Sequence, residues 1–268
     1  MAIKHQDVLR LLAADGLVEA IDHDVRYCAL MARLPPEAAS LQPAQIGADV
    51  IDAVLLRWNC ALQADPSDVP PLYVHKAALA LAVCLHRQGF GDTQPTAAAV
   101  AAVEALNAAV ALSDAFYRRS PEIIALLHSP AVMPARRPST PKQQAAWRAG
   151  DVVAMQVAGR YHAFYVLQVS HGAPIVEFYD IEQDSPFTWE QLRDVAARGQ
   201  RLSDGRHFVR RYEMFAMSQQ PDPAHQFRLL ASGIAPGPDN RHLIPTESLC
   251  TATDIFCMAR ELQAQRQV

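Results

Sequence analysis

Three consecutive runs of β-forming residues constrain the fold of this 268-residue chain more than any other feature. The segment reads GDVVAMQVAGRYHAFYVLQVSHGAPIVEFYD, in which branched and aromatic residues are interrupted only by short glycine-containing turns. It follows a long stretch of helical pattern, so the architecture changes near the middle of the chain. The runs predict strands at Val152–Val157, Tyr161–Val169 and Ile175–Asp180, with a hairpin turn at Ala158–Gly159–Arg160.

The first half of the chain has the apolar spacing of packed helices. Between Ile51 and Leu62 the apolar side chains recur every three or four residues, with polar side chains between them. The segment Leu72–Arg87 is apolar on several faces, which is typical of a helix in the middle of a bundle. Further helices are predicted at Asp7–Ile21, at Tyr27–Leu34, after a Thr96 cap and at Pro121–His128.

The part that follows the three strands combines helical and strand patterns. A helix capped by Thr188 is predicted over Trp189–Ala197, further strands near His207–Met214 and Gln226–Ala231, and a last helix over Thr253–Gln265. The fold class predicted from these patterns is α+β. It consists of an N-terminal helical bundle followed by a C-terminal, strongly bent antiparallel β-sheet domain with one or two packed helices.

A proline-rich segment separates the two parts. From Ser129 to Lys142 the chain reads SPAVMPARRPSTPK, and its four prolines favour an extended backbone. The predicted domains are therefore a helical bundle over residues 1–128, a linker over residues 129–142 and a β-rich domain over residues 143–268.

Charge and composition exclude several classes of protein. The net charge is −4, and residues 150–268 carry 11 basic and 14 acidic side chains, so a basic face for nucleic acid is not expected. No apolar run reaches the length of a membrane span, and acidic residues interrupt the N-terminus too early for a signal peptide. Five cysteines without a CxxC motif indicate reduced thiols. We expect a cytoplasmic protein without a membrane partner.

Motifs for metal binding or catalysis are missing from the sequence. The ten histidines and five cysteines form no HExxH or paired CxxC, and no GxSxG elbow or phosphate-binding loop occurs. The densest cluster, Asp22–His23–Asp24, is interpreted as a polar turn, and Cys250 and Cys257 as small buried hydrophobes. No metal, cofactor or enzymatic activity is predicted. An enzyme whose site is assembled from distant residues would instead reveal a deep polar pocket.

An acidic cluster lies where the third predicted strand ends. Its carboxylates belong to Glu177, Asp180, Glu182 and Asp184. Trp189 follows in the sequence, and aromatic anchors beside charges often dominate interfaces, so the cluster predicts a recognition patch for a basic protein surface. The alternative is a solvated loop that leads into a helix, with Trp189 in the core.

A basic cluster occurs further along the chain, at Arg206, His207, Arg210 and Arg211. Since Arg210 and Arg211 would point to opposite faces of a strand, only part of this group can form one patch. The alternative is internal pairing with the acidic loop. The residues expected to contact a partner are Glu177, Asp180, Glu182, Asp184, Trp189, Arg206 and Arg210.

The segment that opens at Gly150–Asp151 resembles the immunity protein 26 family of bacterial polymorphic-toxin systems. Domains of that family begin with a glycine–aspartate pair, have an aromatic residue early in the second strand, and end a third strand in an apolar–aromatic–aspartate triplet. Tyr161 with Phe164, and Phe178–Tyr179–Asp180, occupy those positions here. The resemblance extends to about Leu243, and the helical half has no counterpart in it.

The resemblance implies a protein that neutralises a cognate protein toxin by non-covalent binding and blocks the toxin's active site or its substrate. The candidate contact residues would then bind the toxin. A small bent β domain that opens with GDVV also occurs in SH3-like barrels, so a nucleic-acid or regulatory binding module is the alternative. An arginine stripe over Arg201, Arg206, Arg210 and Arg211 would favour that alternative. The apolar helices are compatible with a scaffold or with a homodimer surface.

Overall fold

The computed structural model describes residues 3–34, 43–132, 134, 146–202, 204–217, 220–245 and 250–265. Two compact units make up the chain, and each is described by itself. The first unit comprises Met1–Leu55 and Ala61–Pro141, and the second comprises Leu56–Cys60 and Lys142–Val268. Most of the predicted linker at 129–142 lies outside the described residues, so the linker stays a prediction.

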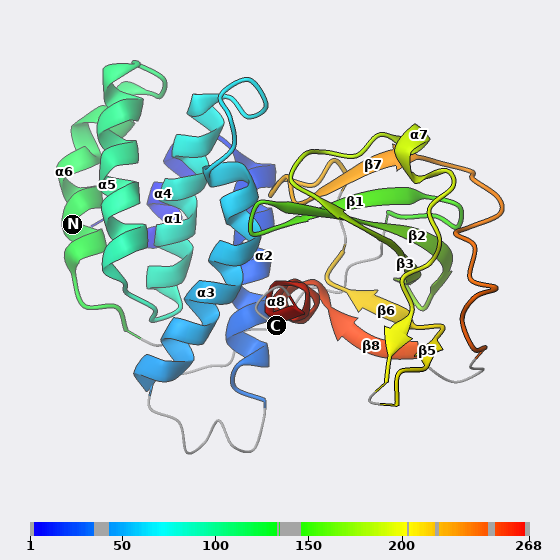
Figure 1. Ribbon diagram of the computed structural model, residues 1–268. Coiled ribbons are helices and arrows are strands. Elements are labelled where there is room, and N and C mark those ends of the chain that lie inside the picture. The colour runs from blue at the N-terminus through cyan, green and yellow to red at the C-terminus, as the bar shows by residue number, and fades with distance from the viewer. Residues whose placement is uncertain are drawn as a thin grey trace. The chain divides into compact units, whose positions relative to one another are not determined.

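Six helices belong to the N-terminal half of the described chain (Figure 1). The helix α4 is central, since it contacts α1, α2, α5 and α6 and all ten residues from Ala77 to His86 are buried. The prediction of a helix in the middle of a bundle is thereby confirmed. The helices are α1 (His5–Leu11), α2 (Asp15–Met31), α3 (Pro43–Leu62), α4 (Pro71–Arg87), α5 (Thr93–Ala108) and α6 (Asp114–His128).

The predicted boundaries of the first two helices are wrong. Helix α1 ends before Ala13, which has a positive φ of 47°, and α2 then continues without interruption to Met31. The cluster Asp22–His23–Asp24 consequently lies inside α2 rather than in a turn. His23 and Asp24 are buried there, with His23 Nδ1 3.4 Å from Asp24 Oδ1. The apolar pattern is continuous across both segments, so it did not reveal where one helix ends and the next begins.

The caps of the last two bundle helices also differ from the prediction. Asp92, and not Thr96, caps α5, because its Oδ1 accepts a hydrogen bond of 2.8 Å from the backbone N–H of Gln94. Helix α6 begins one residue after its Ser113 cap, so Pro121 lies inside the helix instead of in its first turn. Proline was thus a poor marker of this helix start.

The C-terminal half contains a six-stranded sheet with the order β7-β1-β2-β3-β6-β8, and a short β4-β5 ribbon. All neighbouring pairs are antiparallel except β6 and β8, which are parallel. The α+β fold class is confirmed. The strands are β1 (Val152–Val157), β2 (Arg160–Ser170), β3 (Ala173–Gln183), β4 (Gln200–Arg201), β5 (His207–Phe208), β6 (Arg211–Phe215), β7 (Phe227–Ala231) and β8 (Cys250–Asp254).

The bend of the sheet arises where β3 changes its partner. Along β2 and β3, His162 pairs with Glu182 but Phe164 pairs with Phe178, so β3 has extra residues in this interval. In that interval β3 pairs with the segment after α7, because the Asp180 N–H donates to the Ala196 carbonyl and the Arg198 N–H to the Phe178 carbonyl, each at 2.8 Å. Beyond this interval β3 pairs with β2 again, at Glu182 and Gln183, so the extra residues bend β3 locally.

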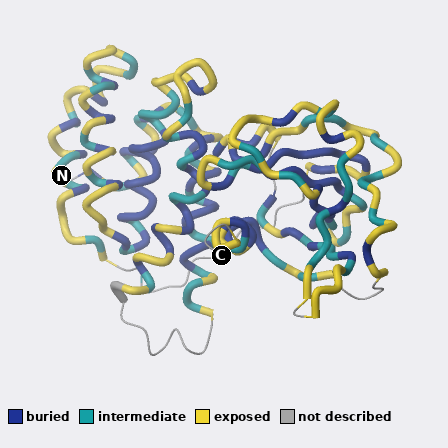
Figure 2. Tube along the Cα trace, in the orientation of Figure 1, coloured by how far each residue is buried: buried dark blue, intermediate teal, exposed yellow. Residues whose placement is uncertain are grey.

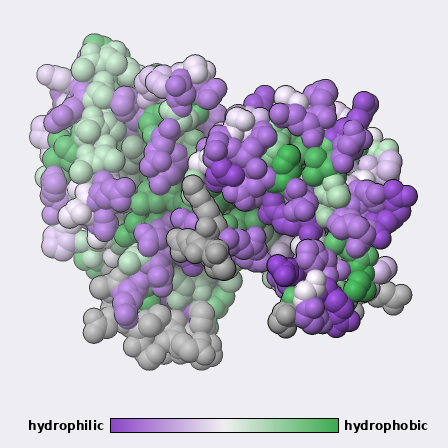
Figure 3. All heavy atoms as spheres, in the orientation of Figure 1, coloured by the Kyte–Doolittle hydropathy of each residue, from purple (hydrophilic) through white to green (hydrophobic). Residues whose placement is uncertain are grey.

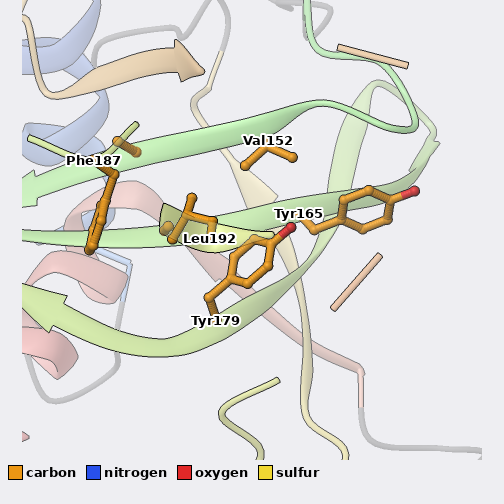
Figure 4. Packing of buried hydrophobic residues seen from close by; sticks show 7 residues of the cluster. Val152, Tyr165, Tyr179, Phe187 and Leu192 are labelled. Carbon is orange, nitrogen blue, oxygen red and sulfur yellow. The ribbon is translucent and has the colours of Figure 1, made fainter. Parts of the chain in front are cut away.

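Both faces of the sheet are covered. On one face the ring of Phe164 meets those of Phe178 and Phe227 at 5.5 Å and 6.3 Å, and α8 (Ile255–Gln265) packs against β1 and β8. On the other face Tyr165 and Tyr179 pack with Leu192 and neighbouring apolar residues (Figure 4). Strand β1 is accordingly almost fully buried, and β2 and β3 each contain a buried stretch, whereas both ends of β2 and the C-terminal end of β3 are intermediate or exposed (Figure 2).

The helix predicted over Trp189–Ala197 is only one turn long. Helix α7 spans Trp189–Leu192, and the Gln191 side chain accepts a hydrogen bond from the Thr188 N–H at 2.8 Å. The helix ends before Ala197 because that residue forms an antiparallel β-bridge with Tyr179. Backbone pairing with the bent strand thus overrides the local helical pattern.

The residues that carry the family resemblance have structural roles here. Gly150 has a φ of +87°, and the Asp151 carboxylate accepts hydrogen bonds of 2.8 Å from the Arg148 N–H and the Ser232 hydroxyl. Phe178 and Tyr179 belong to the cores on the two faces of the sheet. These motif residues therefore indicate how the sheet folds and do not by themselves locate a binding surface.

Replacing Gly150 by alanine is expected to lower the free energy of unfolding by about 2 kcal/mol. The residue has a left-handed backbone conformation, and a Cβ atom would lie 3.1 Å from the Ile234 carbonyl oxygen and 3.2 Å from Gly233 Cα. Urea denaturation measures the loss. Gly159→Ala is the matched control, because Gly159 also has a positive φ but open space around it. Equal losses in both variants would exclude the close contact as a cause.

Candidate functional site

A pocket of about 460 Å³ lies in the second unit, between β3, the β4-β5 ribbon, β6 and α8. Its volume is in the range typical of small-molecule sites. The floor combines the rings of Phe178 and Tyr212, which meet edge to face at 5.8 Å, with Met258 and Leu262 of α8. The rim carries the charged side chains, namely those of Asp180, Arg198, Arg201, Arg210 and Glu261.

One side of the rim is an ion-paired network centred on Glu261. Its Oε1 atom lies 3.7 Å from Arg210 Nη2 and accepts a hydrogen bond from the Tyr212 hydroxyl at 3.3 Å. Burial, with Glu261 as a second cause, raises the pKa of Tyr212 to about 12, so the phenol remains a hydrogen-bond donor at neutral pH. The guanidinium of Arg210 also lies over the Tyr212 ring at 4.8 Å. These contacts fix the side chains of both Arg210 and Tyr212.

A second side of the rim is formed by Arg198 and Asp180. Arg198 donates from Nη2 to the Ile181 carbonyl at 2.8 Å, lies 5.9 Å from the centre of the Phe178 ring, and has Nε 3.9 Å from Asp180 Oδ1. Burial lowers the pKa of Arg198, and Asp180 opposes that shift. The guanidinium nevertheless stays charged at neutral pH.

The third side of the rim is the β4-β5 ribbon. Arg201 and His207 are register partners in this antiparallel pair, and both line the pocket. Gly199 precedes the ribbon with a φ of +63°, and a Cβ atom there would lie 2.8 Å from the Phe208 carbonyl oxygen. Any side chain at this position would clash with the Phe208 backbone, so glycine is needed for the two strands of the ribbon to lie this close together.

The seven residues predicted to contact a partner do not form one patch in the structure. Asp180 and Arg210 both line the pocket. Glu182 and Asp184 form ion pairs with Arg160, whose Nε lies 2.8 Å from Glu182 Oε1. Arg206 is exposed and pairs with Asp204 two residues earlier, with Nη2 2.7 Å from Oδ2.

Glu177 and Trp189 are more enclosed than the other candidates. The side chain of Glu177 is 2% exposed, accepts a hydrogen bond from Asn240 Nδ2 at 3.1 Å and lies 3.7 Å from Arg211 Nε. Trp189 is partly buried against the apolar cluster drawn in Figure 4. Glu177 is therefore too buried to contact a partner in this conformation, and Trp189 offers only part of its indole.

Sequence reasoning did not assign Arg198, Tyr212 or Glu261 to a site. Tyr212 and Glu261 are 49 positions apart and meet only because α8 packs beside β6. The one local signal was the alternation of Phe178 and Asp180 along β3, which brings a ring and a carboxylate to the same side of a strand. Hydrophilic side chains cover most of the face of the sheet unit seen in Figure 3, so hydropathy did not single out this pocket.

Metal-ligating side chains and cysteine thiols are the other groups that could carry chemistry. Within the described ranges no group of three or more His, Cys, Asp or Glu side chains is placed to hold a metal ion. Burial raises the pKa values of the Cys60 and Cys84 thiols to about 12, which makes them inert at neutral pH. Cys250 and Cys257 are exposed, so their predicted burial is wrong.

None of the described helices combines the length and apolar character needed to cross a membrane.

Comparisons of this chain with protein-family models, with curated proteins and with solved structures find no match. The fold and the pocket are therefore interpreted from their own geometry. The resemblance to the immunity protein 26 family stays a prediction that rests on Gly150–Asp151 and the strand residues that follow.

Proposed function

We propose that this chain is a cytoplasmic immunity protein, which binds a cognate protein toxin without covalent chemistry and blocks the toxin's active site or its substrate. The observation that supports the proposal best is a row of exposed carboxylates on the bent half of β3 and the residues after it. Asp180, Glu182 and Asp184 occupy alternate positions, and the side chains of Asp180 and Asp184 are 65% and 80% exposed. We call these three residues the acidic row.

The acidic row is held in place by arginines of its own chain. Arg160 forms ion pairs with Glu182 and Asp184, and Arg198 lies beside Asp180. Exposed ion pairs of this kind contribute little to stability, so a cationic partner surface can replace them at small cost. The three carboxylates also outnumber the two guanidiniums that pair with them. Such a surface favours fast, electrostatically steered association with a basic toxin.

The protein-binding role has a direct test. The chain would be used as bait in a pull-down from its source cell, with the proteins encoded beside it as candidates. A stoichiometric partner that kills cells when expressed alone, and is harmless when expressed with this chain, would support the proposal. A bait that yields no such partner, or that retains nucleic acid after a high-salt wash, would contradict it and favour the SH3-like binding module.

Charge reversal of the acidic row is expected to weaken toxin binding about 30-fold, which corresponds to roughly 2 kcal/mol. The variant is Asp180→Lys, Glu182→Lys and Asp184→Lys combined, and calorimetric titration with the partner measures the effect. The folded state should persist because the three carboxylates are exposed. The matched control reverses the exposed carboxylates of Asp52, Asp68 and Glu104, which changes the net charge equally. An unchanged affinity in the first variant would remove the acidic row from the interface.

The SH3-like alternative gains no support from the arginines that would have formed its stripe. Arg206 pairs with Asp204, Arg210 with Glu261, and Arg211 lies 3.7 Å from Glu177 Oε2. Three of the four arginines are thus partly neutralised by carboxylates, which weakens the phosphate attraction that such a module needs.

A further inference from the structure

The positive charge on the rim of the pocket is unevenly compensated. Of its three guanidiniums, Arg210 pairs with Glu261 and Arg198 lies beside Asp180. The side chains of Arg201 and of its register partner His207 are exposed and form no hydrogen bond or ion pair with any described residue. Free donors therefore gather at the β4-β5 end of the pocket.

A second observation is that the charge of Arg210 is only partly compensated. Arg210 Nε is buried and has no hydrogen-bond partner among the described atoms, although the Arg210 side chain lines the pocket. This atom is enclosed by protein, and among the described residues the positive charge of Arg210 is opposed only by the Glu261 carboxylate, at 3.7 Å. The carboxylate of Glu261 is already engaged by Arg210, by the Tyr212 hydroxyl and by Gln265 Nε2 at 3.4 Å, so its charge is largely compensated.

The floor of the pocket is apolar and aromatic. Phe178, Tyr212, Met258 and Leu262 present rings and aliphatic atoms beneath the charged rim. Small-molecule sites commonly combine such a floor with a few polar groups that fix the orientation of the ligand. Guanidinium groups recognise carboxylates and phosphates through paired hydrogen bonds. The pocket thus suits a ligand with an anionic head and an apolar body.

We propose that the pocket between β3, the β4-β5 ribbon, β6 and α8 binds a small organic anion, in which a carboxylate or phosphate group is attached to an aromatic or aliphatic body. The anionic group binds at the β4-β5 end through Arg201 and His207, and the partly compensated charge of Arg210 adds to the attraction. The apolar body lies on Phe178 and Tyr212. This site does not depend on toxin binding, so the failure of either proposal leaves the other intact.

The test is an NMR titration of the full-length ¹⁵N-labelled protein with phenylacetate as the probe. Phenylacetate is expected to shift the amide signals of Gly199, Gln200 and Tyr212 in a saturable manner. Phenylacetamide, its neutral analogue, should bind at least about tenfold more weakly, because it lacks the charge that the guanidiniums recognise. Phenyl phosphate, titrated in parallel, identifies which of the two anionic groups the pocket prefers. Absence of saturable shifts with both anions, or equal binding of the neutral analogue, would overturn the proposal.

Arg201→Gln is expected to raise the dissociation constant of the preferred probe about fivefold, since it removes one charge-assisted contact. The variant should fold normally, because the Arg201 side chain is exposed and has no partner among the described residues, and the same spectra verify this. The matched control is Arg228→Gln, an exposed arginine on the edge strand β7 outside the pocket. An affinity that drops equally in both variants, or in neither, would contradict the proposed role of Arg201.

Discussion

Replacing Asp222 by alanine is expected to lower the free energy of unfolding of the second unit by about 4 kcal/mol. The Asp222 side chain is 2% exposed and its Oδ1 lies 2.7 Å from Arg57 Nη2. Its carboxylate also accepts hydrogen bonds from the backbone N–H groups of Ala224, Gln226 and Phe227, at 2.9 to 3.2 Å. Alanine would leave the Arg57 guanidinium buried without its carboxylate and three backbone donors without their acceptor.

Urea denaturation followed by tryptophan fluorescence measures this loss. Asp222→Asn retains an acceptor oxygen but not the charge, so its loss should be smaller than that of the alanine variant. Asp239→Ala is the control for an exposed pair. Asp239 binds Arg241 with Nη2 and Oδ2 2.7 Å apart, but both side chains are largely exposed, so a loss below about 1 kcal/mol is expected. If Asp222→Ala cost no more than that control, the buried pair would not stabilise this unit.

Local patterns were sufficient for the strands that carry most of the sheet. The alternation and branching between Val152 and Asp180 predicted β1, β2 and β3, and the turn at Ala158–Gly159 forms the expected hairpin because both residues take a positive φ. Those strands are consecutive and antiparallel, so each pairs with a neighbour in sequence. The parallel pairing of β6 with β8 has no such local signal, and β8 was not predicted.

The buried charged groups show why the site was largely beyond sequence reasoning. Arg57 and Asp222 are 165 positions apart, and the acidic and basic clusters were expected either to face a partner or to pair as groups. One pair between the two clusters forms, with Glu177 beside Arg211, but Asp180 lies beside Arg198, which belongs to neither cluster. Arg198 lies beside Asp180 because the backbone of Ala196–Arg198 pairs with β3 at Phe178 and Asp180, and no local sequence pattern predicts that pairing.

Because of His162, the free energy of unfolding is expected to fall by roughly 3 kcal/mol as the pH is lowered from 7 to about 4. Burial lowers its pKa from 6.5 to about 4, Arg198 adds to the shift, and Glu182 opposes it. The imidazole is 4% exposed, and its Nδ1 has no hydrogen-bond partner among the described atoms. Between the two pKa values the unfolded chain binds a proton that the folded protein does not, so the free energy of unfolding decreases as the pH decreases.

The measurement compares the wild type with His162→Phe by urea denaturation at pH 7 and pH 5. Over this interval the wild type should lose about 2 kcal/mol more than the variant, because phenylalanine has no proton to gain. The variant keeps a planar aromatic ring, although a larger one, and no hydrogen bond of Nδ1 is lost. Carboxylates that titrate over the same range contribute equally to both proteins, so the difference between the two slopes isolates His162. His128→Phe, at an exposed position, should behave like the wild type. If the free energy of unfolding depended on pH identically in the wild type and in His162→Phe, the pKa of His162 would be the same in the folded and unfolded states, which would contradict the prediction.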